Sequence, residues 1–170
     1  MPENKKMYVN YIFQDWKVNG SKGKMVMVLF RCANYATKNN VYRFIAFPYL
    51  LWYRLTVEWF MGIELPWETR VGKRLRLYHG QSLVVHKSTI IGDDCTLRHS
   101  TTIGNKMLPD GTYSASPILG NNVDVGSNAC IIGGIVVKDN VKIGSGAVVI
   151  KNVPGNSTVV GNPGIVIQRE

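Results

Sequence analysis

Apolar residues recur every six positions through most of the chain after residue 64, and glycine often follows them directly. A first series of these anchors comprises Val85, Ile91, Leu97 and Ile103. A second series comprises Leu119, Val125, Ile131, Val137, Ile143 and Val149. An earlier fragment contributes Val71 and Leu77. Small or medium residues stand four positions after the anchors, at Cys95, Thr101, Val123, Ala129, Ile135, Val141 and Ala147.

This period predicts a parallel β-helix, in which three short strands joined by tight turns make one triangular coil. Each coil hides its apolar side only against the next one, so several coils are needed. About four coils are expected between Val71 and Val160. The glycines after the anchors are expected to take positive φ in the turns. The alternative is an ordinary β-sandwich, but the period-two alternation of its strands gives no reason for a strict period of six.

The residues before the repeat have a different character and predict an N-terminal helical region over 1–63, followed by a coil domain with a C-terminal tail over 64–170. Two aromatic and aliphatic stretches, Lys24–Lys38 and Val41–Met61, read as helices. Asn39 and Asn40 separate them and indicate a helix stop. Residues 19–23 read as a loop.

The second of these stretches is about long enough to cross a bilayer, which needs roughly 20 apolar residues. Arg43, Arg54 and Glu58 interrupt it, however, and Pro48 should kink it. Charges near a bilayer centre cost several kcal/mol. The sequence therefore favours a buried or interfacial helix over a transmembrane span.

Charge and cysteine usage restrict the partners and the compartment. The net charge of +9 suits nucleic acid, an anionic membrane or a phosphorylated ligand. No arginine-rich tract or aromatic-basic motif is present, so a polyanionic cofactor or substrate is expected and nucleic acid is not. Cys32, Cys95 and Cys130 form no CxxC pair, which argues against disulfides or zinc and favours a reducing, cytoplasmic compartment. The N-terminus lacks the apolar core of a signal peptide.

The repeat is interrupted twice, and solenoids carry function on such insertions. Leu77 and Val85 are eight positions apart instead of six, so YHGQSLV holds two inserted residues. The segment GNKMLPDGTYSASPI, between Ile103 and Leu119, is too long for a turn and predicts a protruding loop. His79 lies inside the first interruption.

His99 follows His79 by twenty residues, which equals one coil plus the two inserted residues. The two histidines should therefore share a face, with the loop beginning just after His99 on the same side. A histidine can take a proton from a hydroxyl, and a carboxylate that holds its other ring nitrogen improves the base. Glu64 is the candidate carboxylate. On the alternative interpretation, His79 fills a bulge and His99 is a solvated corner residue.

Several segments carry a resemblance to a known family: FMGIEL, VGKRLRLYHG, IIGDDCTLRHSTTIGN, VDVGSNACIIGGIVVKDNVKIGSGAVVIKNVP and VVGNPG. The chain resembles the serine acetyltransferase branch of the hexapeptide-repeat acyltransferases, and within it the colanic acid acetyltransferase type that decorates exopolysaccharides. The repeat and the VxGxP ending are specific to the superfamily, whereas YHG and LRHSTTIGN are specific to this branch.

The resemblance implies a left-handed β-helix, a homotrimer with active sites between neighbouring coils, and direct transfer from acetyl-CoA without an acyl-enzyme or a metal. His79 matches the catalytic base. Glu64 occupies the place of the acid that orients it, which is aspartate in serine acetyltransferases and glutamate in the polysaccharide type. The CoA contacts of the family map onto Asn105, Ser127, Lys142 and Ser145, where Lys142 would meet a CoA phosphate.

Two departures from serine acetyltransferases favour a sugar hydroxyl as the acceptor. Their Asp-Arg-His-Pro segment, which helps to hold the amino acid, reads Ser114, Ala115, Ser116, Pro117 here. Without those side chains a serine carboxylate loses its charge-assisted partners. Tyr78 stands where they have aspartate.

The expected function is therefore sugar O-acetylation in capsule or exopolysaccharide biosynthesis, with His99 and Tyr78 lining the acceptor site. The helices would pack on the trimer or dock it peripherally to the inner membrane face. Serine O-acetyltransferase of cysteine biosynthesis is the alternative.

Two other functions use the same fold. A γ-type carbonic anhydrase needs three histidines on zinc, and this chain has three, at positions 79, 86 and 99, without that family's paired spacing. A non-catalytic scaffold would have no need of the histidine and the glutamate at positions 79 and 64.

Overall fold

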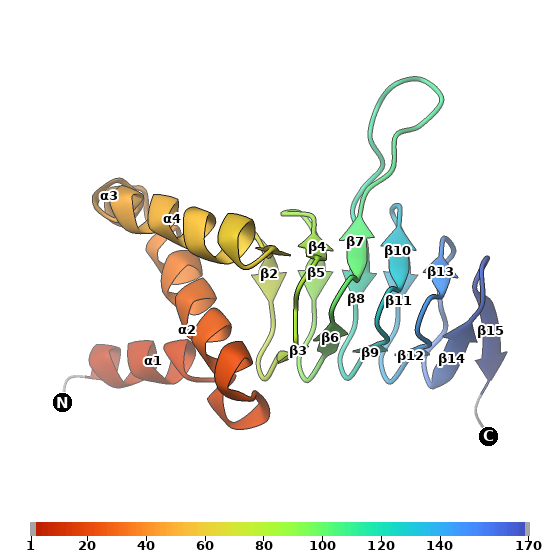
Figure 1. The fold of residues 1–170 in the computed structure, drawn as a ribbon, viewed down its shortest axis with the longest axis horizontal. Coiled ribbons are helices and arrows are strands. Elements are labelled where there is room, and N and C mark those ends of the chain that lie inside the picture. The colour runs from red at the N-terminus through yellow and green to blue at the C-terminus, as the bar shows by residue number, and fades with distance from the viewer. Residues whose placement is uncertain (1–2, 169–170) are drawn as a thin grey trace.

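The computed structural model describes residues 3–168, with side chains from residue 8 onward. Residues 1–2 and 169–170, at the ends of the two predicted regions, lie outside this range. Helices gather at one end, and the rest of the chain winds into a triangular coil whose strands advance away from them (Figure 1). The predicted parallel β-helix is confirmed, with nearly five coils instead of about four.

The helical end consists of six short elements: α1 (Glu3–Ile12), the 3-10 helix η1 (Trp16–Val18), α2 (Ser21–Ala36), α3 (Asn40–Ile45), α4 (Phe47–Tyr53) and the π-helix η2 (Arg54–Phe60). The second predicted helix is thus divided into three, with the first break beside Pro48. The side chain of Asn39 accepts a hydrogen bond from the Val41 N–H and caps α3. Among the described residues, no helix is long and apolar enough to cross a bilayer.

Three sheets form the sides of the coil, and nearly all strand pairs in them are parallel. Sheet A contains β1 (Ile63–Glu64), β4 (Leu83–Val85), β7 (Thr102–Gly104), β10 (Cys130–Ile132) and β13 (Val148–Val149). Sheet B contains β2 (Arg70–Val71), β5 (Ile90–Ile91), β8 (Ile118–Leu119) and β11 (Val136–Val137). Sheet C contains β3 (Arg76–Tyr78), β6 (Thr96–Arg98), β9 (Asp124–Val125), β12 (Lys142–Ile143), β14 (Ser157–Val160) and β15 (Ile165–Gln168).

The anchors stack along the coil axis and form its core. Ile103 pairs with Val85 on one side and with Ile131 on the other, and all three are buried. The small residues four positions after the anchors are buried as well. Burial raises the pKa of one of them, Cys95, to about 11. The six-residue period therefore places one inward side chain per strand and one at each closing corner.

None of the glycines that directly follow the anchors has positive φ, which corrects the sequence expectation, and Gly72, Gly92, Gly120 and Gly126 act through close approach instead. A Cβ added to Gly92 would lie 2.4 Å from the carbonyl oxygen of Gly120 in the next coil. The positive φ falls three positions after the anchors, on Asp94, Ser100, Asn122, Asn128 and Asn140 among others. Asparagine and aspartate tolerate this conformation better than most residues, because their short side chains bond locally.

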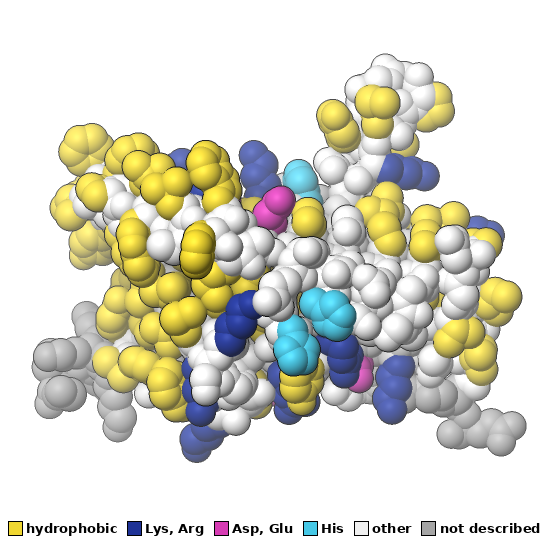
Figure 2. Space-filling model, viewed as in Figure 1, with side chains coloured by type: hydrophobic (Ala, Val, Ile, Leu, Met, Phe, Trp, Pro, Cys, Tyr) yellow, Lys and Arg dark blue, Asp and Glu magenta, His cyan; other side chains and the backbone are white. Residues whose placement is uncertain are grey.

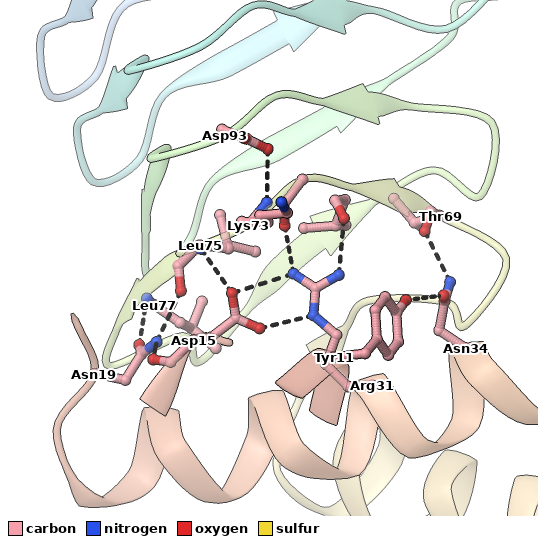
Figure 3. Close-up of polar contacts among 12 residues, drawn as sticks. Tyr11, Asp15, Asn19, Arg31, Asn34, Thr69, Lys73, Leu75, Leu77 and Asp93 are labelled. Carbon is pink, nitrogen blue, oxygen red and sulfur yellow. Dashed lines mark hydrogen bonds and ion pairs between the residues drawn. The ribbon is translucent and has the colours of Figure 1, made fainter. Parts of the chain in front are cut away.

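Polar side chains from the helices close the open end of the first coil, where backbone groups of β2 and β3 have no further strand to pair with (Figure 3). The Arg31 guanidinium donates to the carbonyl oxygens of Val71 and Gly72, at 2.7 and 2.5 Å. Asp15 pairs with Arg31 at 2.7 Å and accepts from the Leu75 N–H at 2.9 Å.

Asn19 and Asn34 extend this network along the same edge. Asn19 accepts from the Leu77 N–H and donates to the Leu75 carbonyl, while Asn34 donates to the carbonyls of Trp67 and Thr69. An exposed sheet edge would otherwise present these groups for pairing with another chain. The helical region thus serves as the cap that solenoids require.

Candidate active site

The corner between sheets C and A carries a column of side chains that includes half of the predicted site residues. In each coil the chain turns there after the sheet C strand, and the successive residues at that point are His79, His99, Ser127 and Ser145. We call this column the C–A ladder. The Asn128 N–H donates to the His99 carbonyl, and the Gly146 N–H donates to the Ser127 carbonyl. The hydroxyls of Ser127 and Ser145 lie 3.3 Å apart.

The two histidines of the ladder lie on the same face one coil apart, as predicted, and their rings are in contact. Their ring centroids are 5.9 Å apart and the rings are nearly perpendicular. His79 has a φ of +63°, in the left-handed region that few residues other than glycine adopt, and Gly80 follows with +73°. The two inserted residues thus turn His79 outward into solvent. Positive φ on two consecutive residues distinguishes this bulge from the regular corners, which have one, and supports a functional hypothesis for that position.

The outer face of sheet C lies beside the ladder and is polar. A groove of about 960 Å³ runs along it, lined by Arg74, Arg76, Asp94, Asp124 and Lys142 among others. Lys142 is exposed there, and Tyr78 is exposed at the ladder end of β3. The Arg98 guanidinium lies 5.4 Å from the centre of the Tyr78 ring. Tyr78 is therefore accessible beside His79, and Lys142 is accessible farther along the same sheet, on β12.

Glu64 and Asn105 lie elsewhere, in a groove of about 480 Å³ that extends over the outer face of sheet A toward its corner with sheet B. We call this groove the A–B groove. Its lining also includes Arg54, His86 and Lys87. No hydrogen bond or ion pair joins Glu64 to His79, although both side chains are among those described. Within one chain, Glu64 therefore does not orient the predicted base.

The protruding loop begins beside the A–B groove, which corrects its predicted position beside His99. β7 lies between His99 and the loop and carries the chain across sheet A, so the loop leaves from the A–B corner. In Figure 2, two of the three histidine side chains lie together, and the third lies apart from them toward the loop. The spacing correctly places the two histidines on one face. The strand β7, which follows His99, then crosses sheet A, so the loop begins at the opposite edge of that sheet.

His86 and Ser116 form a contact in the A–B groove that the sequence interpretation did not single out. The Ser116 hydroxyl oxygen lies 2.8 Å from His86 Nδ1. His86 follows β4, and Ser116 stands where the loop returns to the coil. The loop length was visible in the sequence, but which residue its base would meet depends on how the loop folds back.

Charged side chains gather at one end of this groove, where Arg54, Glu64 and Glu68 line it. Arg54 pairs with Glu58 at 3.3 Å, and the second carboxylate oxygen of Glu58 is buried without a hydrogen-bond partner. Burial raises the pKa of Glu58, Arg54 opposes the rise, and the nearby Glu64 and Glu68 add to it. The groove therefore concentrates acidic groups around a single paired arginine.

Comparison with known proteins decides the family. No protein-family model matches the chain. Over 130 residues it is 38% identical to "Putative colanic acid biosynthesis acetyltransferase WcaB" of Escherichia coli K12, a match that covers 76% of this chain and 78% of that protein. The chain is a hexapeptide-repeat acetyltransferase. It belongs to the serine acetyltransferase branch, as the sequence motifs predicted.

Serine acetyltransferases are further relatives of this acetyltransferase. That of Staphylococcus aureus Mu50 is 36% identical over 113 residues, covering 66% of this chain and 52% of that protein. The structure of the soybean enzyme complexed with serine has a TM-score of 0.73 at 26% identity, covering 87% of this chain and 58% of that one. A serine acetyltransferase complexed with CoA gives 0.71 at 22%, with the same coverage. The acetyltransferase thus spans little more than half of these longer proteins.

Proposed function

We propose that this acetyltransferase moves the acetyl group of acetyl-CoA to a sugar hydroxyl, with His79 as the general base. The observation that carries the proposal is the C–A ladder, in which the outward-turned His79 begins a column that continues through His99, Ser127 and Ser145. A serine acetyltransferase of similar fold is complexed with CoA. CoA is an elongated molecule, and the ladder offers it an extended column of side chains.

The reaction follows from the position of the base. His79 takes the proton of the acceptor hydroxyl as that oxygen attacks the thioester carbonyl carbon, and the carbon–sulfur bond then breaks. The imidazolium returns the proton to the departing CoA sulfur. The hydroxyls of Ser127 and Ser145 lie farther along the ladder and are proposed to contact the CoA chain. The cationic Lys142 is exposed on the adjacent face and suits a CoA phosphate.

The separation of Glu64 from His79 supports a homotrimer. A threefold assembly joins two different edges of the same chain, because its interface is heterologous. The C–A ladder and the A–B groove flank sheet A and are two such edges. We infer that Glu64 and Asn105 of one chain meet His79 of its neighbour, so that Glu64 orients the base and Asn105 contacts CoA across the interface.

A neutral acceptor fits the residues at the loop base. Ser114, Ala115 and Ser116 offer no cation to an amino acid carboxylate. The exposed Tyr78 beside His79 offers an aromatic face and a hydroxyl, which suit a sugar ring. The relationship to a protein named for colanic acid biosynthesis favours an acceptor in capsule or exopolysaccharide synthesis.

Serine O-acetyltransferase remains the second candidate because relatives at 36% identity carry that name. The two candidates are separated by assaying CoA release from acetyl-CoA with methyl glycosides and with L-serine. We expect turnover with at least one glycoside and little with serine. Efficient turnover of serine alone would reverse the assignment.

The two-chain site is tested by mixing two inactive variants, His79→Ala and Glu64→Ala, after dissociation and reassembly. If the two residues of one site come from different chains, about a quarter of the sites in randomly mixed trimers contain neither substitution. Activity should then return to roughly that fraction of wild type. If both residues act within one chain, every site keeps one substitution and the mixture stays inactive.

The helices carry an exposed apolar face that we assign to peripheral contact with the inner surface of the cytoplasmic membrane. Phe44 and Phe60 are 85% and 89% exposed, and Figure 2 shows hydrophobic side chains over much of this end. The face also includes Val41, Tyr42, Ile45, Phe47, Leu51, Trp52, Leu55 and Trp59. Exposed apolar patches of this kind mark interaction sites, and aromatic side chains favour the bilayer interface.

The net charge of +9 complements anionic lipid. A cytoplasmic setting also suits the three free cysteines and the use of acetyl-CoA. The protein should sediment with vesicles that contain phosphatidylglycerol, and the double variant Phe44→Ser/Phe60→Ser should not. If the face instead packs between chains, vesicles fail to bind wild type and the variant loses its trimer.

A further inference from the structure

The contact between His86 and Ser116 fixes the chemistry of the His86 ring. Besides the Ser116 hydroxyl at 2.8 Å, the backbone N–H of Ser88 lies 3.2 Å from the same ring nitrogen, Nδ1. A backbone N–H can only donate, so Nδ1 acts as an acceptor and carries the lone pair. The Ser116 hydroxyl must then donate to it as well. In the neutral ring the proton therefore sits on Nε2.

Nε2–H is consequently a free hydrogen-bond donor at the A–B groove. Nε2 has no hydrogen-bond partner among the described residues. It is also not one of the buried polar atoms left without a partner, so it is accessible to a ligand. His86 is half-buried, with its ring braced on one side by the loop base and by Ser88. A donor held in this way is ready for a ligand, because little side-chain freedom remains to be lost on binding.

The groups around this donor match the chemistry of neighbouring hydroxyls. The A–B groove contains the exposed carboxylate of Glu64, which only accepts, and the half-buried amide of Asn105, which donates and accepts. A sugar hydroxyl both donates and accepts, so a ring hydroxyl can accept from Nε2 while its neighbour attacks from beside the His79 that Glu64 orients. The volume of about 480 Å³ is in the range of a small-ligand pocket.

We propose that His86, held by Ser116, binds the acceptor sugar by donating from Nε2 to a ring hydroxyl next to the one that is acetylated. The inference rests on the proposed two-chain site, which brings the A–B groove of one chain against the His79 of its neighbour. His86 is then a specificity residue that neither abstracts a proton nor carries the acetyl group. Ser116 is its positioning residue.

A nucleophilic role for Ser116 is the competing interpretation, since serine and histidine at 2.8 Å also occur in acyl-enzyme chemistry. Ser116 is only 9% exposed, however, and its hydroxyl is directed at the His86 ring. A nucleophile must reach the thioester carbon, which a buried hydroxyl at the loop base does not. Positioning therefore explains the contact better than attack.

The test measures acceptor and donor kinetics with methyl glucoside, galactoside and mannoside, using the glycoside that wild type turns over best. His86→Ala should raise the acceptor KM about tenfold, the size of one lost neutral hydrogen bond. The KM for acetyl-CoA should not change. His86→Gln, whose amide can also donate, should recover part of the loss. Lys138→Ala, an exposed change outside both edges, is the matched control and should behave as wild type.

Ser116→Ala separates the two interpretations. Because the Ser88 N–H still holds the ring, we expect only a twofold to fivefold rise in acceptor KM, within the range of a weakened hydrogen bond. A nitrogen NMR spectrum of the imidazole should show the Nε2–H tautomer in wild type at pH 8. A thousandfold loss of kcat in Ser116→Ala, or an acetylated Ser116 trapped in the absence of acceptor, would establish the nucleophile instead.

Failure of this inference is distinguishable from failure of the proposed function. If wild type acetylates L-serine and none of the glycosides, the sugar assignment is wrong and the inference falls with it. If wild type acetylates a glycoside while His86→Ala keeps the wild-type acceptor KM, the function stands and His86 does not bind the acceptor. An unchanged KM in both His86 variants together with a fall in kcat would likewise reject the binding role.

Discussion

The repeated positions of the coil differ from the places where the repeat stops. At repeated positions each side chain meets its own kind in the next coil, as Ile103 does between Val85 and Ile131. At the bulge, the loop and the capped end, the contacts involve polar groups instead of apolar anchors: His79 meets His99, Ser116 meets His86, and Arg31 meets backbone carbonyls.

This difference separates stability from chemistry. A residue in the stack is fixed by the coils above and below it, and changing it disturbs both neighbours. A residue at an interruption is released from the stack and is free to face a ligand or another chain. Substitutions in the two groups should therefore affect different quantities, and the following experiments can break or sharpen that distinction.

The largest effect is expected at the bulge. His79→Ala should lower kcat by about 10²–10⁴-fold, the usual contribution of a general base. The melting temperature should change little, because the His79 side chain is exposed and outside the core. Steady-state kinetics and thermal unfolding of the same preparation provide the check. If this variant kept the wild-type kcat while His99→Ala was inactive, the general base would be His99, one coil away from His79.

The capped end should show the next largest effect, in stability. Arg31→Met leaves the Asp15 carboxylate buried without its cation, which typically costs about 3–5 kcal/mol. Urea unfolding would measure the loss. Arg74→Ala is the matched control, since it breaks an Arg–Asp pair that is nearly half exposed and should change the unfolding midpoint little. Equal losses in the two variants would contradict the capping role of Arg31.

A repeated position should show a smaller loss of stability, which depends on how closely the glycine approaches the next coil. Gly92→Ala places a methyl group 2.4 Å from the Gly120 carbonyl oxygen, and overpacking of this kind costs about 1–3 kcal/mol. In Gly104→Ala the nearest atom is 3.7 Å away, on the His86 side chain. That control should unfold close to wild type. Similar midpoints for both variants would mean that the coils can separate at little cost.

The sequence predicted the regular parts far better than the partners at the interruptions. The period of six is a local pattern that identified the anchors, the closing residues and the His79–His99 pair. The Arg31–Asp15 cap could not be predicted from a local pattern. Arg31 lies 16 positions from Asp15 and 40 positions from Val71, whose carbonyl oxygen it binds. Residue spacing alone predicts the loop beside His99, because it does not reveal that β7 first crosses sheet A.

The smallest expected effect concerns His99, which occupies a regular position of the ladder but contacts His79 in the bulge. His99→Ala should mainly raise the acceptor KM, because its ring borders His79 and its Nδ1 is buried without a hydrogen-bond partner. A twofold to tenfold rise is expected if the ring lines the sugar site, about the value of one hydrogen bond. His99→Asn, which keeps a polar side chain at the corner, is the control. Its acceptor KM should lie between those of wild type and His99→Ala. A drop in kcat with an unchanged acceptor KM would instead show that His99 acts on His79 and not on the sugar.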